Sequence, residues 1–209
     1  MRTLNEDTKD AFRTACKRIL YAKRGFDIKD HKLTTLLQRW VRPKMGLKVL
    51  IYYPLVHEVD IRPFINWARR HKMRLFAPLM HPPCCTYAPY RLPLSTLKHI
   101  KQPRPSFFKA PLDLAIVPIL GVDCGFRRVG FGLGAYDRLF ATLPKKPFTI
   151  FTARQLLKSA HTLGAPHDIS AHICLEPNND FIHQRTTNGR SFKHFAPLLI
   201  HRHRRVLLH

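Results

Sequence analysis

The sequence predicts an α/β fold, a three-layer sandwich with a mainly parallel sheet and helices on both faces. Apolar, β-branched runs alternate with helical patterns along most of the chain, and such alternation is typical of parallel sheets. In residues 112–138 an apolar run leads through a glycine-rich turn into a helical pattern that begins near Ala135. Because ligands of this class bind at the carboxyl ends of the strands, residues 121–134 are expected to lie at a binding site.

Apolar spacing and end signals place the individual elements. Helices are predicted where apolar residues recur at helical spacing or where Asp60 and Pro63 mark a start, over residues 8–22, 33–41, 60–71 and 154–161. Strands are predicted over residues 48–54, 73–80, 149–151 and 169–175, together with the apolar run from Leu112. The Pro-rich stretch 82–111 is expected to be irregular.

The length of 209 residues fits one domain, predicted over residues 1–177, followed by a basic appendage over 178–209 that is expected to be partly disordered. The appendage ends in His201, His203 and His209, whose spacing is not expected to form a functional metal site. The chain is expected to act as a monomer.

The net charge of +23 predicts attraction to polyanions such as nucleotides, polyglutamylated substrates, RNA or acidic membrane surfaces. The basic residues are spread along the chain, so no dedicated nucleic-acid partner is expected. No apolar run is long enough to cross a membrane, and the five scattered cysteines favour reduced thiols in the cytoplasm.

The alternating glycines Gly130, Gly132 and Gly134 stand between a predicted strand and a predicted helix. Backbone N–H groups of such a loop can approach a phosphate closely, and the helix N-terminus adds positive potential. The pattern is neither GxGxxG nor GxxxxGK[ST], so a phosphate site and a plain glycine-rich turn both remain open on spacing alone. Acidic residues are scarce, and none lies between Ile61 and Leu112. Each acidic residue after that gap is therefore a candidate Mg²⁺ ligand: Asp113, Asp123, Asp137, Asp168, Glu176 and Asp180.

Several segments, in order, resemble the 5-formyltetrahydrofolate cyclo-ligase family, also called methenyltetrahydrofolate synthetase. The segments are KDAFR at 9–13, YYPLVHEVDI at 52–61, QP at 102–103, LDLAIVPILGVD with RRVGFGLGAYDR within 112–138, and PHDIS at 166–170. The chain departs from the family pattern at Ile119, at Ala135 (where the family has a tyrosine) and at His172. Ala135 is expected to affect the folate side, and His172 the surroundings of a metal.

The resemblance implies ATP- and Mg²⁺-dependent closure of 5-formyltetrahydrofolate to 5,10-methenyltetrahydrofolate, with release of ADP and phosphate through a phosphorylated imidate. It implies ATP binding by Lys9, Arg13, Arg128, Gly130, Gly132, Gly134 and Tyr136, with Arg128 and Tyr136 also catalytic. It implies that Asp137 and Asp168 hold Mg²⁺. It implies folate binding by Tyr53, Glu58, Phe131, Gly132, Leu133, Gly134 and Ala135.

Each of these residues also has a plainer interpretation. Lys9 and Arg13 fit a solvated helix stripe, Asp137 a charge that favours its helix N-terminus, and Tyr136 core packing. Glu58 fits a surface residue at a strand end, and Asp168 a turn. Two other functions stay open: an inactive relative that binds folate, and an RNA-binding protein that kept the fold. Binding to RNA would weaken steeply with salt and would need no ATP.

Overall fold

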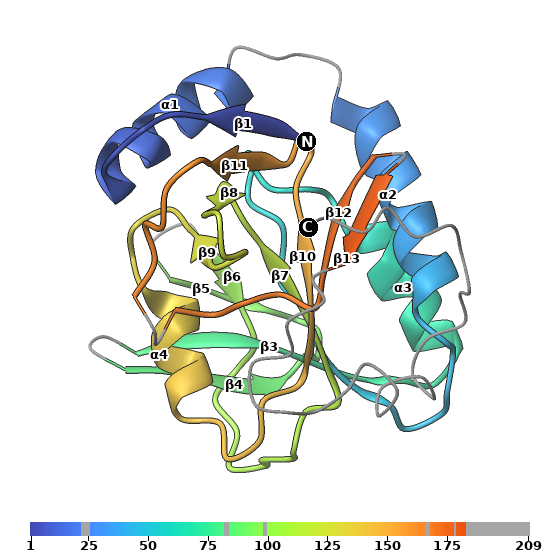
Figure 1. Cartoon of the computed structure of the whole chain (residues 1–209). Coiled ribbons are helices and arrows are strands. Elements are labelled where there is room, and N and C mark those ends of the chain that lie inside the picture. Colours follow the sequence, from blue (N-terminus) through green and yellow to red (C-terminus); the bar gives the residue numbers. More distant parts are fainter. Residues whose placement is uncertain (22–25, 82–83, 98–99, 166–167, 178, 183–209) are drawn as a thin grey trace.

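The computed structural model describes residues 1–21, 26–81, 84–97, 100–165, 168–177 and 179–182 (Figure 1). It has the predicted α/β class, with sheets that are mostly parallel. The helices are α1 (Lys9–Tyr21), α2 (Phe26–Trp40), α3 (Arg62–Arg70) and α4 (Ala135–Ala141). His167 and the residues from 183 onward, with the three histidines of the tail, lie outside the described residues.

The main sheet has the strand order β13-β12-β10-β7-β2-β3-β4. Its strands are β2 (Lys48–Leu50), β3 (Arg74–His81), β4 (Cys84–Pro89), β7 (Leu114–Pro118), β10 (Phe148–Thr152), β12 (Ile173–Glu176) and β13 (Asn179–Ile182). Neighbours from β12 to β3 pair in parallel, while β13 and β4 pair antiparallel at the two edges. Because these strands are parallel, the carboxyl ends of β2, β7 and β10 lie at the same end of the sheet.

Both faces of this sheet are buried, as parallel strands require. On one face Val49 and Ile116 pack with Leu37 of α2 and Phe64 of α3. On the opposite face successive residues of the same strands pack with Leu139 and Phe140 of α4. Figure 1 shows α2 and α3 together on one side of the sheet and α4 near β3 and β4. The alternation of adjacent side chains between two cores explains why these strands read as continuous apolar runs.

A smaller sheet, ordered β1-β11-β8-β9, joins the N-terminus to the glycine segment. Its strands are β1 (Arg2–Leu4), β8 (Gly121–Val122), β9 (Arg128–Val129) and β11 (Leu157–Ser159). α1 packs against it through Phe12, Cys16 and Leu20. A Cβ at Gly121 would lie 2.7 Å from the carbonyl oxygen of Leu157, so the close approach of β8 and β11 requires glycine. This packing brings α1 to the glycine loop.

Several expected elements were wrong. Residues 82–111 are not wholly irregular, because they include β4 and the hairpin β5 (Ser95–Leu97) and β6 (Ile100–Gln102). The helix expected over 154–161 is replaced by β11, which pairs with β1 and β8. Pairing with distant segments overrides the local helical spacing there.

Other boundaries shift. The strand expected over 48–54 ends at Leu50, and the helix expected over 33–41 begins already at Phe26. Ile61, not Asp60, is the N-cap of α3, although Asp60 accepts a hydrogen bond from the backbone N–H of Arg62 at 2.9 Å. The strand expected over 169–175 begins at Ile173. β13 carries the sheet to Ile182, and no helix in the described part of the chain is long and apolar enough to span a membrane.

Candidate functional site

Two pockets adjoin at the glycine loop, between the carboxyl end of β7 and the start of α4. The first, called the basic pocket, has a volume of about 420 Å³. It is lined by Lys9, Arg13, Arg128, Gly130, Gly132, Gly134, Asp137, Arg138, Ala141 and Asp168. Of the residues that the sequence assigned to ATP and Mg²⁺, all but Tyr136 line this one pocket, although they come from α1, β9, the glycine loop, α4 and the segment before β12.

Contacts within the basic pocket tie α1 to the loops around it. Lys9 Nζ lies 2.5 Å from Asp168 Oδ2, and the same carboxylate accepts the N–H of Ala165 at 2.8 Å. Arg13 donates from Nε to the carbonyl oxygen of Gly130 at 3.2 Å. Lys9 and Arg13 are therefore not a solvated stripe, because both face the pocket and bind its walls. The cations outnumber the carboxylates along the lining, so the pocket favours a polyanion.

The geometry of the loop favours glycine, as Gly130 and Gly134 show. A Cβ at Gly130 would lie 2.2 Å from Nη1 of Arg128, so a side chain there would displace the guanidinium. Gly134, the N-cap of α4, has φ of +60°, a left-handed conformation that glycine adopts without strain. The loop thus holds Arg128 on one side and starts α4 on the other.

Arg128 lies in the wall between the two pockets and is only 6% exposed. Its Nε donates to the carbonyl oxygen of Pro118, at the end of β7, at 3.2 Å. Its Nη1 lies 3.9 Å from Oδ2 of Asp137. Burial lowers the pKa of the Arg128 guanidinium, and the nearby charge of Asp137 opposes that shift. A buried guanidinium can interact strongly with an incoming anion, because little water screens its charge.

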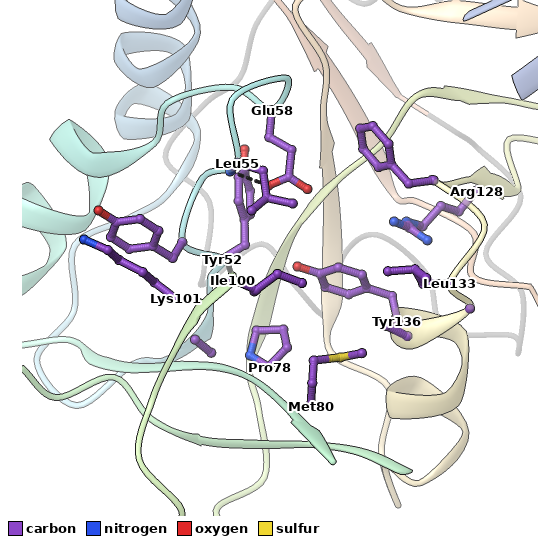
Figure 2. A pocket seen from close by; sticks show the side chains of 15 residues that line it. Tyr52, Leu55, Glu58, Pro78, Met80, Ile100, Lys101, Arg128, Leu133 and Tyr136 are labelled. Carbon is purple, nitrogen blue, oxygen red and sulfur yellow. Dashed lines mark hydrogen bonds between the residues drawn. The ribbon is translucent and has the colours of Figure 1, made fainter. Parts of the chain in front are cut away.

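The second pocket, called the aromatic pocket, is narrower, about 120 Å³ (Figure 2). Its lining includes seven residues that the sequence assigned to substrate or catalysis besides Arg128: Tyr53, Glu58, Phe131, Leu133, Gly134, Ala135 and Tyr136. Sequence reasoning missed Tyr52, Leu55, Ala77, Pro78, Met80, Ile100 and Lys101. Gly132 lines the basic pocket instead, and Tyr136, expected to bind ATP, lines the aromatic one.

Glu58 is the carboxylate of the aromatic pocket. Its Oε2 accepts the N–H of Leu55 at 3.0 Å, drawn as a dashed line in Figure 2. Burial raises the pKa of Glu58 to about 7, against the smaller lowering effects of the Leu55 hydrogen bond and of Arg128 and Arg154. Burial also raises the pKa of Tyr136. An acceptor among apolar and aromatic walls suits a flat heterocycle that carries N–H donors.

The two candidate metal ligands, Asp137 and Asp168, both line the basic pocket. Within the described ranges no group of three or more His, Cys, Asp and Glu side chains is arranged to hold a metal. Mg²⁺ in nucleotide sites is bound by one or two carboxylates together with phosphate oxygens and water, so this donor set fits a metal that arrives with a phosphate ligand.

His172, which the sequence resemblance placed near a metal, lies away from the two pockets. Its Nδ1 accepts the N–H of Thr149 at 3.0 Å, and its ring packs on Phe148 with centroids 4.5 Å apart. Phe148 begins β10 and Ile173 begins β12, so His172 is at the amino ends of the strands. The pockets are at the carboxyl ends of the strands, so His172 is remote from any metal bound there.

The fold and the two pockets define an α/β protein with a basic and an aromatic site side by side at the carboxyl ends of parallel strands. The structure is similar to a 5,10-methenyltetrahydrofolate synthetase from Aquifex aeolicus, with a TM-score of 0.69 and 22% identity over 88% of this chain and 95% of that one. It is also similar to a 5,10-methenyltetrahydrofolate synthetase from Mycoplasma pneumoniae, with a TM-score of 0.62 and 20% identity over 83% of this chain and 100% of that one.

At these identities the likeness shows a shared fold, and it is the fold that the sequence resemblance implied. No protein-family model and no curated protein matches the sequence.

Proposed function

We propose that the protein is a 5-formyltetrahydrofolate cyclo-ligase, which converts 5-formyltetrahydrofolate and ATP to 5,10-methenyltetrahydrofolate, ADP and phosphate. The observation that carries the proposal is the shared wall: Arg128 and Gly134 line both the basic and the aromatic pocket. A reaction that transfers a phosphoryl group onto a heterocyclic substrate needs such adjacent sites. The likeness to two 5,10-methenyltetrahydrofolate synthetases supports the same reaction.

In this proposal the triphosphate of ATP occupies the basic pocket. Backbone N–H groups of the glycine loop approach its oxygens, and Lys9, Arg13 and Arg128 neutralise its charge. The pterin ring occupies the aromatic pocket, where Glu58 accepts hydrogen bonds from its N–H groups. Tyr53, Phe131 and the segment to Ala135 line the ring's surroundings. The formyl group then faces Arg128 at the wall.

The chemistry explains why a phosphate donor is needed. The formamide carbon is a poor electrophile, so its oxygen must first become a leaving group. That oxygen attacks the γ-phosphorus, the bond to the β-bridging oxygen breaks, and ADP leaves. The folate N10 attacks the activated carbon and loses its proton. The C–O bond then breaks, phosphate departs with the electron pair, and the methenyl ring remains.

Arg128 is the residue placed to stabilise the transferred group, because its guanidinium lies where the two substrates would meet. Its hydrogen bond to the Pro118 carbonyl and its contact with the Tyr136 ring fix its direction before substrate arrives. Tyr136 closes the folate side and excludes water from the activated intermediate. Mg²⁺, held by Asp137 and Asp168, would supply further charge neutralisation to the phosphates.

The test is a turnover assay with purified protein, 5-formyltetrahydrofolate, Mg²⁺ and ATP, followed by the near-ultraviolet absorbance of the methenyl product. An ATP-dependent rise in absorbance is expected, together with stoichiometric ADP. Folate binding without turnover would leave an inactive scaffold as the function.

We also place the reaction in the cytoplasm, a proposal supported by the five cysteines, which are all free thiols.

A further inference from the structure

A loop between β2 and α3, residues 51–61, carries four residues of the aromatic pocket wall: Tyr52, Tyr53, Leu55 and Glu58. The proposed function uses Tyr53 and Glu58. The loop has no regular secondary structure, so its shape depends on contacts with neighbouring segments. The Tyr52 hydroxyl provides one contact, because it donates to the carbonyl oxygen of Val59 and also pairs with Thr152 Oγ1, both at 3.0 Å.

A buried ion pair lies beside the loop. Arg154, just after β10, donates from Nε to Asp30 Oδ1 at 2.7 Å and from Nη2 to Asp30 Oδ2 at 2.8 Å. Asp30 belongs to α2, and the two side chains are only 8% and 9% exposed. Such a two-bonded pair fixes both direction and distance, which a lysine in place of the arginine would not do.

Both members of the pair also bind the loop backbone. Asp30 Oδ2 accepts the N–H of Asp60 at 3.0 Å, and Arg154 Nη1 donates to the carbonyl oxygen of Val56 at 3.3 Å. These bonds lie two residues before and two residues after Glu58. The charge of Arg154 also reaches the Glu58 carboxylate, whose pKa it lowers slightly.

We propose that Asp30 and Arg154 are positioning residues, which clamp the loop on both sides of Glu58 so that its carboxylate faces the aromatic pocket. The assignment of a folate to that pocket rests on the proposed function, whereas the clamp itself does not. A buried ion pair adds little net stability compared with an apolar pair of similar size. Its two bonds to the loop backbone therefore explain its presence better than a stabilising role does.

The first experiment measures loop exchange without substrate. Hydrogen–deuterium exchange of residues 53–60 is compared in wild type, Arg154→Met, Arg154→Lys and the control Asp113→Asn. Asp113 is a matched control because it accepts the backbone N–H of Lys48 at 2.9 Å, at the amino end of β2 and away from both pockets. Faster exchange confined to the loop is expected in both Arg154 variants and not in the control. Unchanged loop exchange in Arg154→Lys, which keeps the charge and loses the two-bonded geometry, would overturn the clamp.

The second experiment measures kinetics. Arg154→Met and Asp30→Asn should each raise the KM for 5-formyltetrahydrofolate about tenfold to a hundredfold and leave the KM for ATP near wild type, because misplacement is confined to one pocket. The double variant should be little worse than either single variant, since both break one unit. An equal rise in the KM values for both substrates, or additive effects in the double variant, would assign the pair to general stability instead. If wild type itself shows no turnover, the proposed function fails, and the exchange result still decides the clamp.

Discussion

The guanidinium carbon of Arg128 lies 4.8 Å from the centroid of the Tyr136 ring. Tyr136 lines the aromatic pocket, while its neighbour Asp137 lines the basic pocket and lies 3.9 Å from the same guanidinium. The first turn of α4 therefore directs two adjacent side chains to opposite sides of Arg128. One buried cation thus contacts a ring on the side of the aromatic pocket and a carboxylate on the side of the basic pocket.

Gly130→Ala should lower kcat about a hundredfold or more, the loss typical when one positioned donor is removed from a developing charge. The added Cβ would stand 2.2 Å from Arg128 Nη1, so the guanidinium must move. The measurement is steady-state turnover together with the melting temperature. Gly125→Ala is the control, because its Cβ would meet nothing closer than Asp123 Oδ1 at 3.4 Å. A wild-type kcat in Gly130→Ala would contradict the proposal that Arg128 stabilises the transferred phosphoryl group.

Glu58 should make stability depend on pH. Its pKa is about 7 in the folded protein, above the ordinary 4.5, so the folded state holds the proton more tightly than the unfolded state. The resulting stabilisation is present below pH 4.5 and is lost as pH rises through about 7. Glu58→Gln keeps an acceptor for the Leu55 N–H but cannot ionise. Its melting temperature should match wild type at pH 4 and exceed it at pH 8. A difference that is the same at both pH values would contradict the raised pKa.

The same ionisation should appear in folate binding. In the proposed complex the Glu58 carboxylate would accept two N–H bonds from the pterin, and the protonated acid would accept them less well. The KM for 5-formyltetrahydrofolate should therefore rise as pH falls below about 7 in wild type. Glu58→Gln should show a high KM at every pH. A KM that is independent of pH in wild type would contradict this role of Glu58.

The fold was predictable where a local pattern is long enough to read. The run 114–118, the glycine loop and the start of α4 follow from apolar residues, glycines and a helical pattern in sequence. The small sheet was not predictable, because β8 and β9 have two residues each and pair only through tertiary contacts. β11 lies in a segment with helical spacing, and its strand state depends on β1 and β8 lying beside it.

The site divides in the same way. Charged and glycine residues with a motif, such as Lys9 and Gly130, were predictable and line the basic pocket. Pro78 and Met80 were not, because an apolar residue in a strand gives no sign of whether it faces a core or a pocket. Lys101 lay in a stretch expected to be irregular. Only the pairing of β5 with β6 and the position of β3 reveal that these residues share a wall.

Asp137→Ala should nearly abolish turnover while leaving the fold intact. Asp137 lines the basic pocket with Asp168 and lies beside Arg128, so its loss removes a proposed Mg²⁺ ligand and a partner of that cation. Turnover as a function of Mg²⁺ concentration checks this, with far-ultraviolet circular dichroism for the fold. Asp168→Asn should also need more Mg²⁺, although it additionally loses the ion pair with Lys9. A wild-type rate in Asp137→Ala would refute its role as a metal ligand.

Lys101 should favour substrates that carry extra carboxylates. Its ammonium lies 5.2 Å from the Tyr53 ring centroid and lines the aromatic pocket, although the residue itself is exposed. An exposed ion pair contributes roughly 0.2–1 kcal/mol, so Lys101→Gln should raise the KM for a folate with several glutamates by a factor of about 1.4 to 5. The KM for ATP should not change, and Lys145→Gln, outside both pockets, serves as control. Added salt should reduce the wild-type preference for longer glutamate tails, because screening weakens exposed pairs first. Equal KM values for short and long tails at low salt would exclude this role for Lys101.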